Sequence, residues 1–382
     1  MIFLSLVENV DLRERVLRIL RHQPVDRAVW QPSLTYWYTT NRVGSITPAT
    51  APSSARPFVP DGLMGLDPVQ LYERIQGSIR YPHECLNLPS FYTQLLPGSK
   101  VERRATWMDN KELVETVKTP VGTIQKRSRD GFPLEHYVKT TGDIDAVEYW
   151  LACTEYCFNP YMFDAASEVI EHLGVVQTYN FRSPYQRSVI EFLGLATTTR
   201  FLRKHPRRME TFFDRLLEWD KSAYEVILDS PLQVVSFGEN IDANLSPPPV
   251  FEKFHVPYYK ERIKRVHEKG KLCHIHMDGD LNGLLQFLPE LDFDGIEAVT
   301  FKPQGNVSIE EVVDAMGKKV LLDGIPSIYF LPQYSDEDVL AFARRVLDAF
   351  YPRIILGISD ELCPTMQGHK LGLVGYLVAN YP

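Results

Sequence analysis

The chain is 382 residues long, with 44% hydrophobic residues and a net charge of −8 from 41 basic and 49 acidic residues. The hydrophobic fraction excludes global disorder, and the acidic balance disfavours a nucleic-acid-binding protein, which would carry a basic excess. No apolar stretch approaches the ~20 residues that a membrane-spanning helix needs. Five cysteines in this length are typical of a reducing compartment. We therefore expect a cytoplasmic globular protein with no nucleic-acid or membrane partner, and a small-molecule enzyme as the leading class.

Residues 1–140 predict an N-terminal extension, a first strand and a small separate sheet. Asp11, followed by apolar residues at helical spacing, predicts a helix that ends before Pro24. The segment AVWQPSL, residues 28–34, predicts the first strand. Between residues 100 and 140, polar residues alternate with apolar or β-branched ones, which predicts a short antiparallel meander.

From about residue 159, apolar strands alternate with amphipathic helices. The predicted strands are GVVQTYN, PLQVVSFG, KLCHIHM, GIEAV, KKVLLDG and RIILGIS. Such strands, joined by helices, require a parallel sheet that helices cover. Residues 28–34 and a segment near 86–96 would raise the six strands to eight.

We therefore expect an α/β fold, a (β/α)8 TIM barrel with an N-terminal helical extension and a short antiparallel β meander. We expect one domain over residues 1–382, with the main βα repeats in 141–382. A doubly wound open sheet is the alternative, but no predicted strand is followed by a glycine-rich phosphate turn.

In a barrel of this kind, functional residues lie where strands end and the following loops begin. The segment CHIHMDG carries the strongest signal, because strand alternation places His274, His276 and Asp278 on one face. Two imidazoles and a carboxylate at a strand mouth are groups that bind Zn²⁺. His274 is alternatively an interior, hydrogen-bonded histidine. Asp278 is a ligand, a proton donor or the cap of the next helix.

Other strand ends supply further candidates. Glu239 ends an apolar strand, where a carboxylate needs a partner, so it is a ligand, a general acid or one half of a salt bridge. Asn240 orients substrate or bonds the amides of its own turn. Cys363 is a thiolate ligand or a buried, inert thiol. His255, in a loop at the same rim, and Asp360 are further candidate ligands.

Aromatic residues are candidates for a substrate pocket. Tyr36 and Trp37 belong to the cluster TYWY, and Tyr179 lies at the end of the strand GVVQTYN. These side chains either line a pocket for a flat apolar substrate or, for the first two, pack the extension onto the barrel.

The chain resembles the uroporphyrinogen decarboxylase superfamily, which contains the decarboxylase itself and zinc-dependent, corrinoid-linked methyltransferases. The similarity runs, in order, through RERVLRILRHQPVDRAVW, KTPVGTIQ, the run from VVSFGENID to FKPQGNVSIEEV, LLDGIP and ILGISDELCP. The arginine-rich signature of the decarboxylase is replaced here by PSLTYWYTTNRVG. The His-x-Cys-Gly motif of the methyltransferases reads His276-Met277-Asp278-Gly279, and Cys363 lies near the position of their distal cysteine. The resemblance is therefore nearer to the methyltransferases that demethylate O-methyl compounds.

This resemblance implies a corrinoid-dependent methyltransferase, the O-demethylase component of its system. It would move a methyl group from a small O-methyl substrate, of the methoxyaromatic kind, to a corrinoid (cobalamin) on a partner protein, with zinc as Lewis acid. The expected metal ligands are Glu239, His276 and Cys363, and the expected catalytic residues are Asp278 and Glu239. The expected substrate-binding residues are Asn240, Tyr36, Trp37 and Tyr179. A homodimer is compatible with the sequence.

Two other functions remain open at this point. One is a metal-free, decarboxylase-like enzyme acting on a carboxylated small molecule, with Asp278 and Glu239 as proton-transfer groups. The other is a binding protein that keeps the barrel without catalysis.

Overall fold

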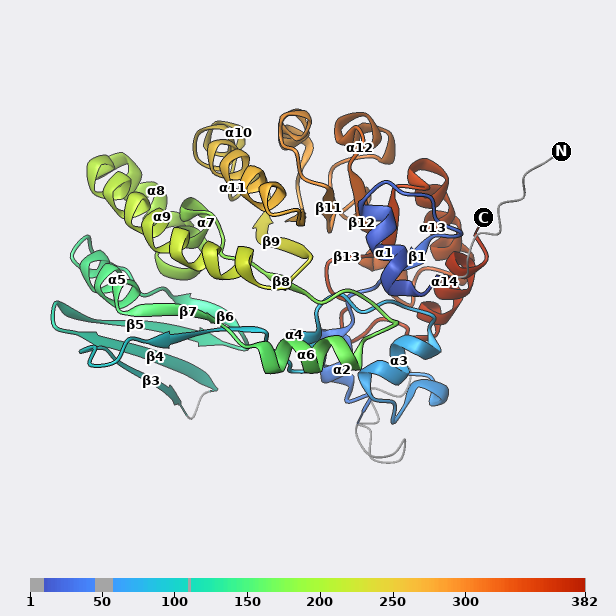
Figure 1. Cartoon of the computed structure of the whole chain (residues 1–382), viewed down its shortest axis with the longest axis horizontal. Coiled ribbons are helices and arrows are strands. Elements are labelled where there is room, and N and C mark those ends of the chain that lie inside the picture. Colours follow the sequence, from blue (N-terminus) through green and yellow to red (C-terminus); the bar gives the residue numbers. More distant parts are fainter. Residues whose placement is uncertain (1–9, 45–57, 109–110, 382) are drawn as a thin grey trace.

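The computed structural model describes residues 10–44, 58–108 and 111–381. Its centre is a curled parallel sheet of seven strands in the order β1-β13-β12-β11-β10-β9-β8 (Figure 1). These strands are β1 (Val29–Trp30), β8 (Gln177–Tyr179), β9 (Val234–Ile241), β10 (Leu272–Met277), β11 (Gly295–Glu297), β12 (Val320–Pro326) and β13 (Ile354–Ser359). The alternation of parallel strands and helices predicted from about residue 159 onward is confirmed.

Helices lie along the outer side of this sheet (Figure 1). The longer ones are α6 (Pro160–Val169), α8 (Leu195–Lys204), α9 (Pro206–Asp229), α11 (Val256–Glu268), α12 (Ile309–Met316), α13 (Asp336–Phe350) and α14 (His369–Ala379). Short elements between them are α7 (Pro184–Arg187), η2 (Ser188–Phe192), α10 (Pro248–Val250), η3 (Phe251–His255), η4 (Asn282–Glu290) and η5 (Ser327–Phe330). None of the described helices is both long and apolar enough to cross a membrane.

Residues 78–80 link the two edges of the curled sheet. The Ser78 backbone N–H donates to the Trp30 carbonyl (2.7 Å), and the Gln177 N–H donates to the Arg80 carbonyl (3.3 Å). Ile79 forms a parallel bridge with Gly174, just before β8. These backbone bonds place the segment between β1 and β8.

The prediction that a segment near 86–96 belongs to this sheet is wrong. Its strand, β2 (Phe91–Leu95), pairs antiparallel with β7 (Thr154–Phe158) in a separate two-stranded sheet. The middle residues of β2 are exposed, whereas a strand inside a helix-covered parallel sheet is buried on both faces.

The N-terminal part contains the predicted helix and meander. In α1 (Leu12–Leu20), the Asp11 carboxylate accepts the Glu14 N–H at 2.8 Å, as a helix cap does. The meander contains β3 (Glu102–Trp107), β4 (Glu112–Thr119) and β5 (Gly122–Arg129), and β6 (Phe132–Glu135) extends it to four strands. It packs on α5 (Asp143–Ala152) and lies apart from the large sheet (Figure 1). The remaining elements are α2 (Thr35–Asn41), η1 (Asp61–Leu63), α3 (Pro68–Arg74) and α4 (Pro82–Cys85).

The inside of the curled sheet changes character along the strands. At the strand starts, a buried apolar cluster joins α1 to inward-facing residues; its members include Leu17, Val29, Val234, Val320 and Leu322. Burial of one large apolar side chain contributes about 1.5–3 kcal/mol, so α1 closes this end firmly. Towards the strand ends, the inward positions become polar and charged, and the candidate site lies there.

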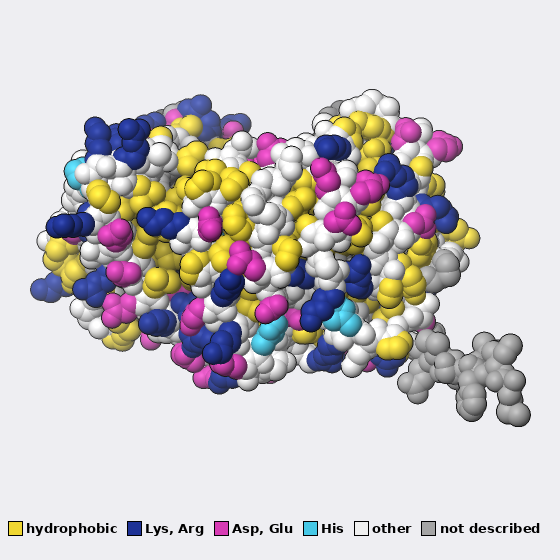
Figure 2. Space-filling view, turned by 90° about the horizontal axis from the view of Figure 1, so that it is seen from above, with side chains coloured by type: hydrophobic (Ala, Val, Ile, Leu, Met, Phe, Trp, Pro, Cys, Tyr) yellow, Lys and Arg dark blue, Asp and Glu magenta, His cyan; other side chains and the backbone are white. Residues whose placement is uncertain are grey.

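The outer surface mixes charge types. On the face shown in Figure 2, basic and acidic side chains are interspersed among apolar ones. A groove of about 750 Å³ lies between α9 and the η3–α11 segment. Its lining contains none of the predicted site residues, so we place the candidate site at the strand ends and not in this groove.

Candidate functional site

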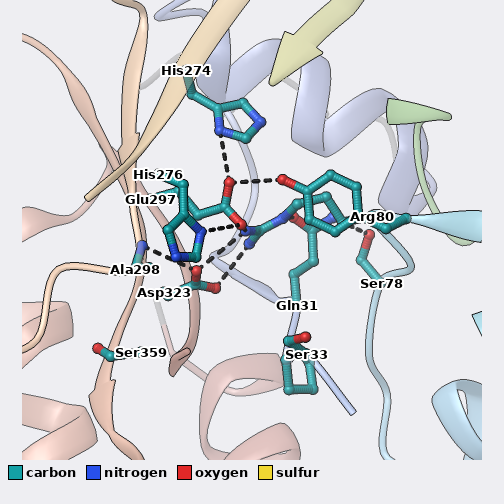
Figure 3. Close-up of polar contacts among 12 residues, drawn as sticks. Gln31, Ser33, Ser78, Arg80, His274, His276, Glu297, Ala298, Asp323 and Ser359 are labelled. Carbon is teal, nitrogen blue, oxygen red and sulfur yellow. Dashed lines mark hydrogen bonds and ion pairs between the residues drawn. The ribbon is translucent and has the colours of Figure 1, made fainter. Parts of the chain in front are cut away.

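The buried guanidinium of Arg80 is at the centre of the site's ion pairs. Arg80 follows the edge-linking segment, and its Nη1 and Nη2 atoms lie 2.8 Å from Glu297 Oε1 and 2.9 Å from Asp323 Oδ1 (Figure 3). Arg80 Nε donates to the Gln31 side-chain oxygen at 2.8 Å. Gln31 in turn donates to the Ser78 hydroxyl at 2.8 Å. One cation therefore joins β11, β12 and the residue that follows β1.

Glu297 is the centre of a second set of contacts. The Tyr81 hydroxyl donates to Glu297 Oε2 at 2.7 Å, and His274 Nδ1 lies 3.0 Å from the same oxygen. Tyr81 also lies 3.0 Å from the Ser236 hydroxyl. Burial opposes ionisation of Glu297, but Arg80 and the neighbouring histidines hold its pKa well below the usual range. Glu297 is therefore a carboxylate inside the protein.

His276 lies beside Glu297 in this network (Figure 3). Its Nδ1 atom lies 3.6 Å from Glu297 Oε1, an ion-pair distance longer than a hydrogen bond. Both ring nitrogens are buried without a hydrogen-bond partner among the described residues. Burial lowers the pKa of His276, but Glu297, Asp278 and Asp360 together raise it to about 9. The imidazole is thus a cation at neutral pH with an unused N–H.

Four carboxyl groups lie near His276. Asp278 and Asp360 raise the pKa of the imidazole. Burial and the Glu361 charge raise the pKa of Glu84 to about 7. Burial also raises the pKa of Glu361, which accepts hydrogen bonds from the Ser33 hydroxyl and the Tyr36 N–H. The surroundings of His276 are therefore rich in carboxyl groups whose ionisation burial opposes.

Four non-glycine residues within or directly after neighbouring strands β9, β11, β12 and β13 have a positive φ. They are Asn240 (54°), Ala298 (67°), Asp323 (78°) and Asp360 (69°). This conformation is rare outside glycine, and clusters of it mark functional sites. At Asp323 it has a direct structural effect: the side chain turns inward to Arg80, although strand alternation would point it outward with Leu321.

The structure brings some of the predicted site residues into this region. His276 and Asp278 are both here, and so is His274, in its alternative role as an interior histidine 2.7 Å from the Gln177 side-chain oxygen. Tyr179 packs against Tyr81 with ring centroids 4.4 Å apart. An added Cβ at Gly238 would lie 2.6 Å from the Tyr179 ring, so this glycine makes room for the aromatic side chain.

The predicted metal ligands Glu239, His276 and Cys363 are not brought together. Phe237 pairs with Ile275 in the sheet, so Glu239 lies on the outward face while His276 points inward. Glu239 accepts hydrogen bonds from the Ser183 N–H (2.7 Å) and hydroxyl (3.0 Å). Cys363 lies in the exposed loop after β13. Among the described residues, only His267, Cys273 and Asp294 hold three such ligand atoms within 4.8 Å of one another.

Other candidates have structural partners. His255 is fully buried behind Glu239, with its Nδ1 2.9 Å from the Ser183 hydroxyl. Asn240 accepts a hydrogen bond from Arg182 at 3.0 Å. Trp37 is fully buried and donates to the Met366 carbonyl at 3.0 Å, whereas the Tyr36 side chain is half exposed. For Trp37 these contacts favour packing over pocket lining.

Sequence reasoning missed Arg80, Tyr81 and Glu297 as site residues. Glu297 gave a usable signal, because it is an ionisable residue inside the apolar strand GIEAV. Arg80 and Tyr81 gave none, because the segment before them is too short to show strand periodicity.

Comparisons with known proteins agree with the observed fold. Residues 190–375 match the model of the uroporphyrinogen decarboxylase (URO-D) family. A methyltransferase from Methanosarcina mazei has a similar structure, with a TM-score of 0.59 and 13% sequence identity, over 97% of this chain and 98% of that one. A B12-independent methionine synthase from Shewanella sp. W3-18-1 is less similar (TM-score 0.41, 8% identity, 92% and 96% coverage), too little to support an inference. None of the curated proteins compared with the chain matches it.

At 13% identity, the likeness to the Methanosarcina protein shows a shared fold. The family match, in turn, covers the part of the chain from which β9 to β13 come. Together they confirm the resemblance of this chain to the uroporphyrinogen decarboxylase superfamily that the sequence motifs predicted.

Proposed function

We propose that the chain is a methyltransferase that takes a methyl group from a small O-methyl compound, of the methoxyaromatic kind, and passes it to a corrinoid on a partner protein. We further propose that the curled sheet, with residues 78–80 as its eighth member, is a closed (β/α)8 barrel. The observation that carries the functional proposal is the buried, unpartnered ring nitrogen of His276 at the strand ends. The methyltransferase with the same fold supports it.

His276 would act on the leaving oxygen. When the bond between the methyl carbon and the ether oxygen breaks, both bonding electrons stay with oxygen, and the charge must be neutralised. The imidazolium N–H of His276 would donate its proton there, and Glu297 holds the ring in its charged form. A reduced corrinoid on the partner protein would supply the nucleophile that accepts the methyl group. Tyr179, beside Tyr81, would bound the pocket for a flat ring.

Zinc would supply the same stabilisation as a Lewis acid. Of the three expected ligands, however, Glu239 already binds Ser183 on the other face of its strand, and the set does not assemble. We therefore assign no step to a zinc ion.

The decarboxylase-like alternative has less support. A substrate carboxylate needs a free cation, but all three guanidinium nitrogens of Arg80 are already engaged by Glu297, Asp323 and Gln31. The carboxyl groups around His276 would offer such a substrate no positive charge. The same argument favours a neutral methoxyaromatic donor over a methoxybenzoate.

The test uses the full chain with methoxybenzenes as donors and free cob(I)alamin as the acceptor. Methyl transfer is followed by the absorbance of methylcobalamin and by the phenol released. We expect turnover with neutral donors, and a loss of about 100-fold or more in kcat for His276→Gln, the usual range for a general acid. His172→Gln, at an exposed histidine paired with Glu73, is the matched control and should keep full activity. Absence of transfer from every donor, or full activity in His276→Gln, would contradict the proposal.

A further inference from the structure

A second cluster of metal-binding side chains lies at the opposite end of strand β10 from His276. It contains His267, near the end of α11, Cys273, the second residue of β10, and Asp294, just before β11. These residues come from a helix, a strand and a loop. No step of the proposed methyl transfer uses them.

The three ligand atoms lie close enough together to share one metal ion after a small shift. His267 Nε2 lies 2.9 Å from Asp294 Oδ2, and Cys273 Sγ lies 3.9 Å from the same imidazole nitrogen. All three ligand atoms fall within 4.8 Å of one another. A tetrahedral ion with bonds of about 2.0–2.3 Å needs its ligands about 3.3–3.9 Å apart. A small outward shift of the carboxylate would therefore meet this geometry.

The backbone already holds two of the ligands in place. The Cys273 N–H donates to Asp294 Oδ2 at 2.7 Å, and the Asp294 N–H donates to the Cys273 carbonyl at 2.9 Å. This reciprocal pair fixes the thiol and the carboxylate side by side. His267, on the last turn of α11, is the ligand that this backbone pair does not hold.

The cluster is buried at Cys273 and partly exposed at His267 and Asp294. Cys273 is fully buried, whereas the His267 and Asp294 side chains are 36% and 18% exposed. An ion can therefore enter past the imidazole and reach a thiol that solvent does not reach. Water can fill the fourth position from the exposed side.

The donor set identifies the ion. Sulfur, imidazole nitrogen and carboxylate oxygen together are ligands of Zn²⁺, whereas Mg²⁺ and Ca²⁺ prefer oxygen alone. Zn²⁺ with one thiolate, one carboxylate and one neutral imidazole carries no net charge, so its partial burial costs little. The exposed Lys318 and Asp292 also act on His267, with opposite signs.

We propose that His267, Cys273 and Asp294 form a zinc site that stabilises the fold. The ion would join the end of α11 to β10 and to the segment that leads into β11, at the end of the sheet where stability and not catalysis is expected to be determined. This zinc site is separate from the His276 region and does not depend on the proposed methyl transfer.

The test titrates the metal-free full chain with Zn²⁺ and, separately, with Co²⁺. We expect one ion per chain, a rise in Tm on Zn²⁺ addition, and a thiolate-to-cobalt charge-transfer band in the near ultraviolet for the Co²⁺ form. His267→Gln and Cys273→Ala should each weaken binding by about 100-fold or more, since even changes to residues around metal ligands cost 10–100-fold. His172→Gln and Cys363→Ser, at exposed positions elsewhere, should leave it unchanged.

The Co²⁺ spectrum of the unmodified chain keeps the test decisive if a variant at the buried Cys273 does not fold. Absence of the charge-transfer band would overturn the proposal. So would zinc binding that His267→Gln leaves unchanged, or that His276→Gln abolishes, because the ion would then lie at the other end of β10.

Discussion

Two buried glutamates on the strands that flank β10 have opposite ionisation. Glu297 on β11 and Glu239 on β9 are both almost completely buried. Glu297 points into the sheet and meets Arg80 at 2.8 Å, and its pKa lies well below the usual range. Glu239 points out of the sheet and binds Ser183, and burial raises its pKa to about 8. Burial alone therefore does not determine charge; the presence of a buried cation does.

The two faces of the sheet have different roles: the inward face carries groups suited to chemistry, and the outward face carries groups that hold the packing together. The inward region has a cation, a carboxylate and a free imidazole N–H close together, which is what group transfer needs. The outward region has neutral groups hydrogen-bonded to one another: Glu239, Ser183 and His255, whose pKa is lowered to about 3 by burial. A protonated Glu239 stabilises the packing of η3 on β9 and is poorly suited to bind a metal.

Arg80→Met should have the largest effect. The substitution leaves Glu297 and Asp323 buried without their cation, and loss of one partner from a buried ion pair costs about 3–5 kcal/mol. We expect the free energy of unfolding in urea to fall by this amount and the pKa of Glu297 to rise towards that of Glu239. Arg215→Met, at an exposed pair with Glu218, should cost less than about 1 kcal/mol. Equal effects of the two substitutions would show that the Arg80 network contributes no special stability.

Glu239→Gln should change the pH dependence of stability. The pKa of this carboxyl is about 8 in the folded chain against an ordinary 4.5. Its stabilising effect is therefore complete below about pH 4.5 and is lost as the pH rises to 8, by at most about 1.4 kcal/mol per pH unit. Glutamine stays neutral, so the variant should match the unmodified chain at pH 5 and exceed it at pH 8.5, on the order of 3 kcal/mol.

Urea unfolding at the two pH values measures this difference. Glu297→Gln is the matched control, since a glutamate that is charged when folded should show no such gain at pH 8.5. A Glu239→Gln chain that is less stable at pH 8.5 than the unmodified one would contradict the assignment of a neutral Glu239. Loss of a bound metal ion in the same variant would instead support the ligand role expected from the sequence.

Glu297→Gln should lower stability less than Arg80→Met, because Asp323 still pairs with Arg80, but it should have a clear effect on His276. Glu297 is the main group that raises the pKa of the imidazole to about 9 against the effect of burial. Without its charge, the pKa of His276 should fall, because burial then opposes the charged ring with less compensation, as followed by NMR titration of the ring. Methyl transfer at pH 8 should then fall about tenfold or more, because the proton donor is lost. An unchanged His276 pKa in this variant, or an equal fall in Glu239→Gln, would contradict the claim that Glu297 is the carboxylate that keeps His276 charged.

Much of the fold could be predicted from the sequence because it depends on local patterns. The apolar strands from GVVQTYN to RIILGIS alternate with amphipathic helices, and this order alone requires a parallel, helix-covered sheet. The antiparallel meander follows from period-two alternation between turn residues. The alternation in CHIHMDG also placed His274 and His276 on one face, as observed. The same alternation, counted from Phe237, places Glu239 on the outward face, opposite to His276.

What only the tertiary structure decided is which distant residues meet. The segment 78–80 has three residues and no detectable period, yet its backbone bonds bring Arg80 into the sheet interior. The positive φ of Asp323 breaks the alternation that a sequence rule assumes, so its carboxylate faces Arg80 instead of the helices. Local periodicity determines the face on which a side chain lies, whereas the charge of a buried group depends on contacts across more than 200 residues of sequence, and these exist only once the sheet has curled.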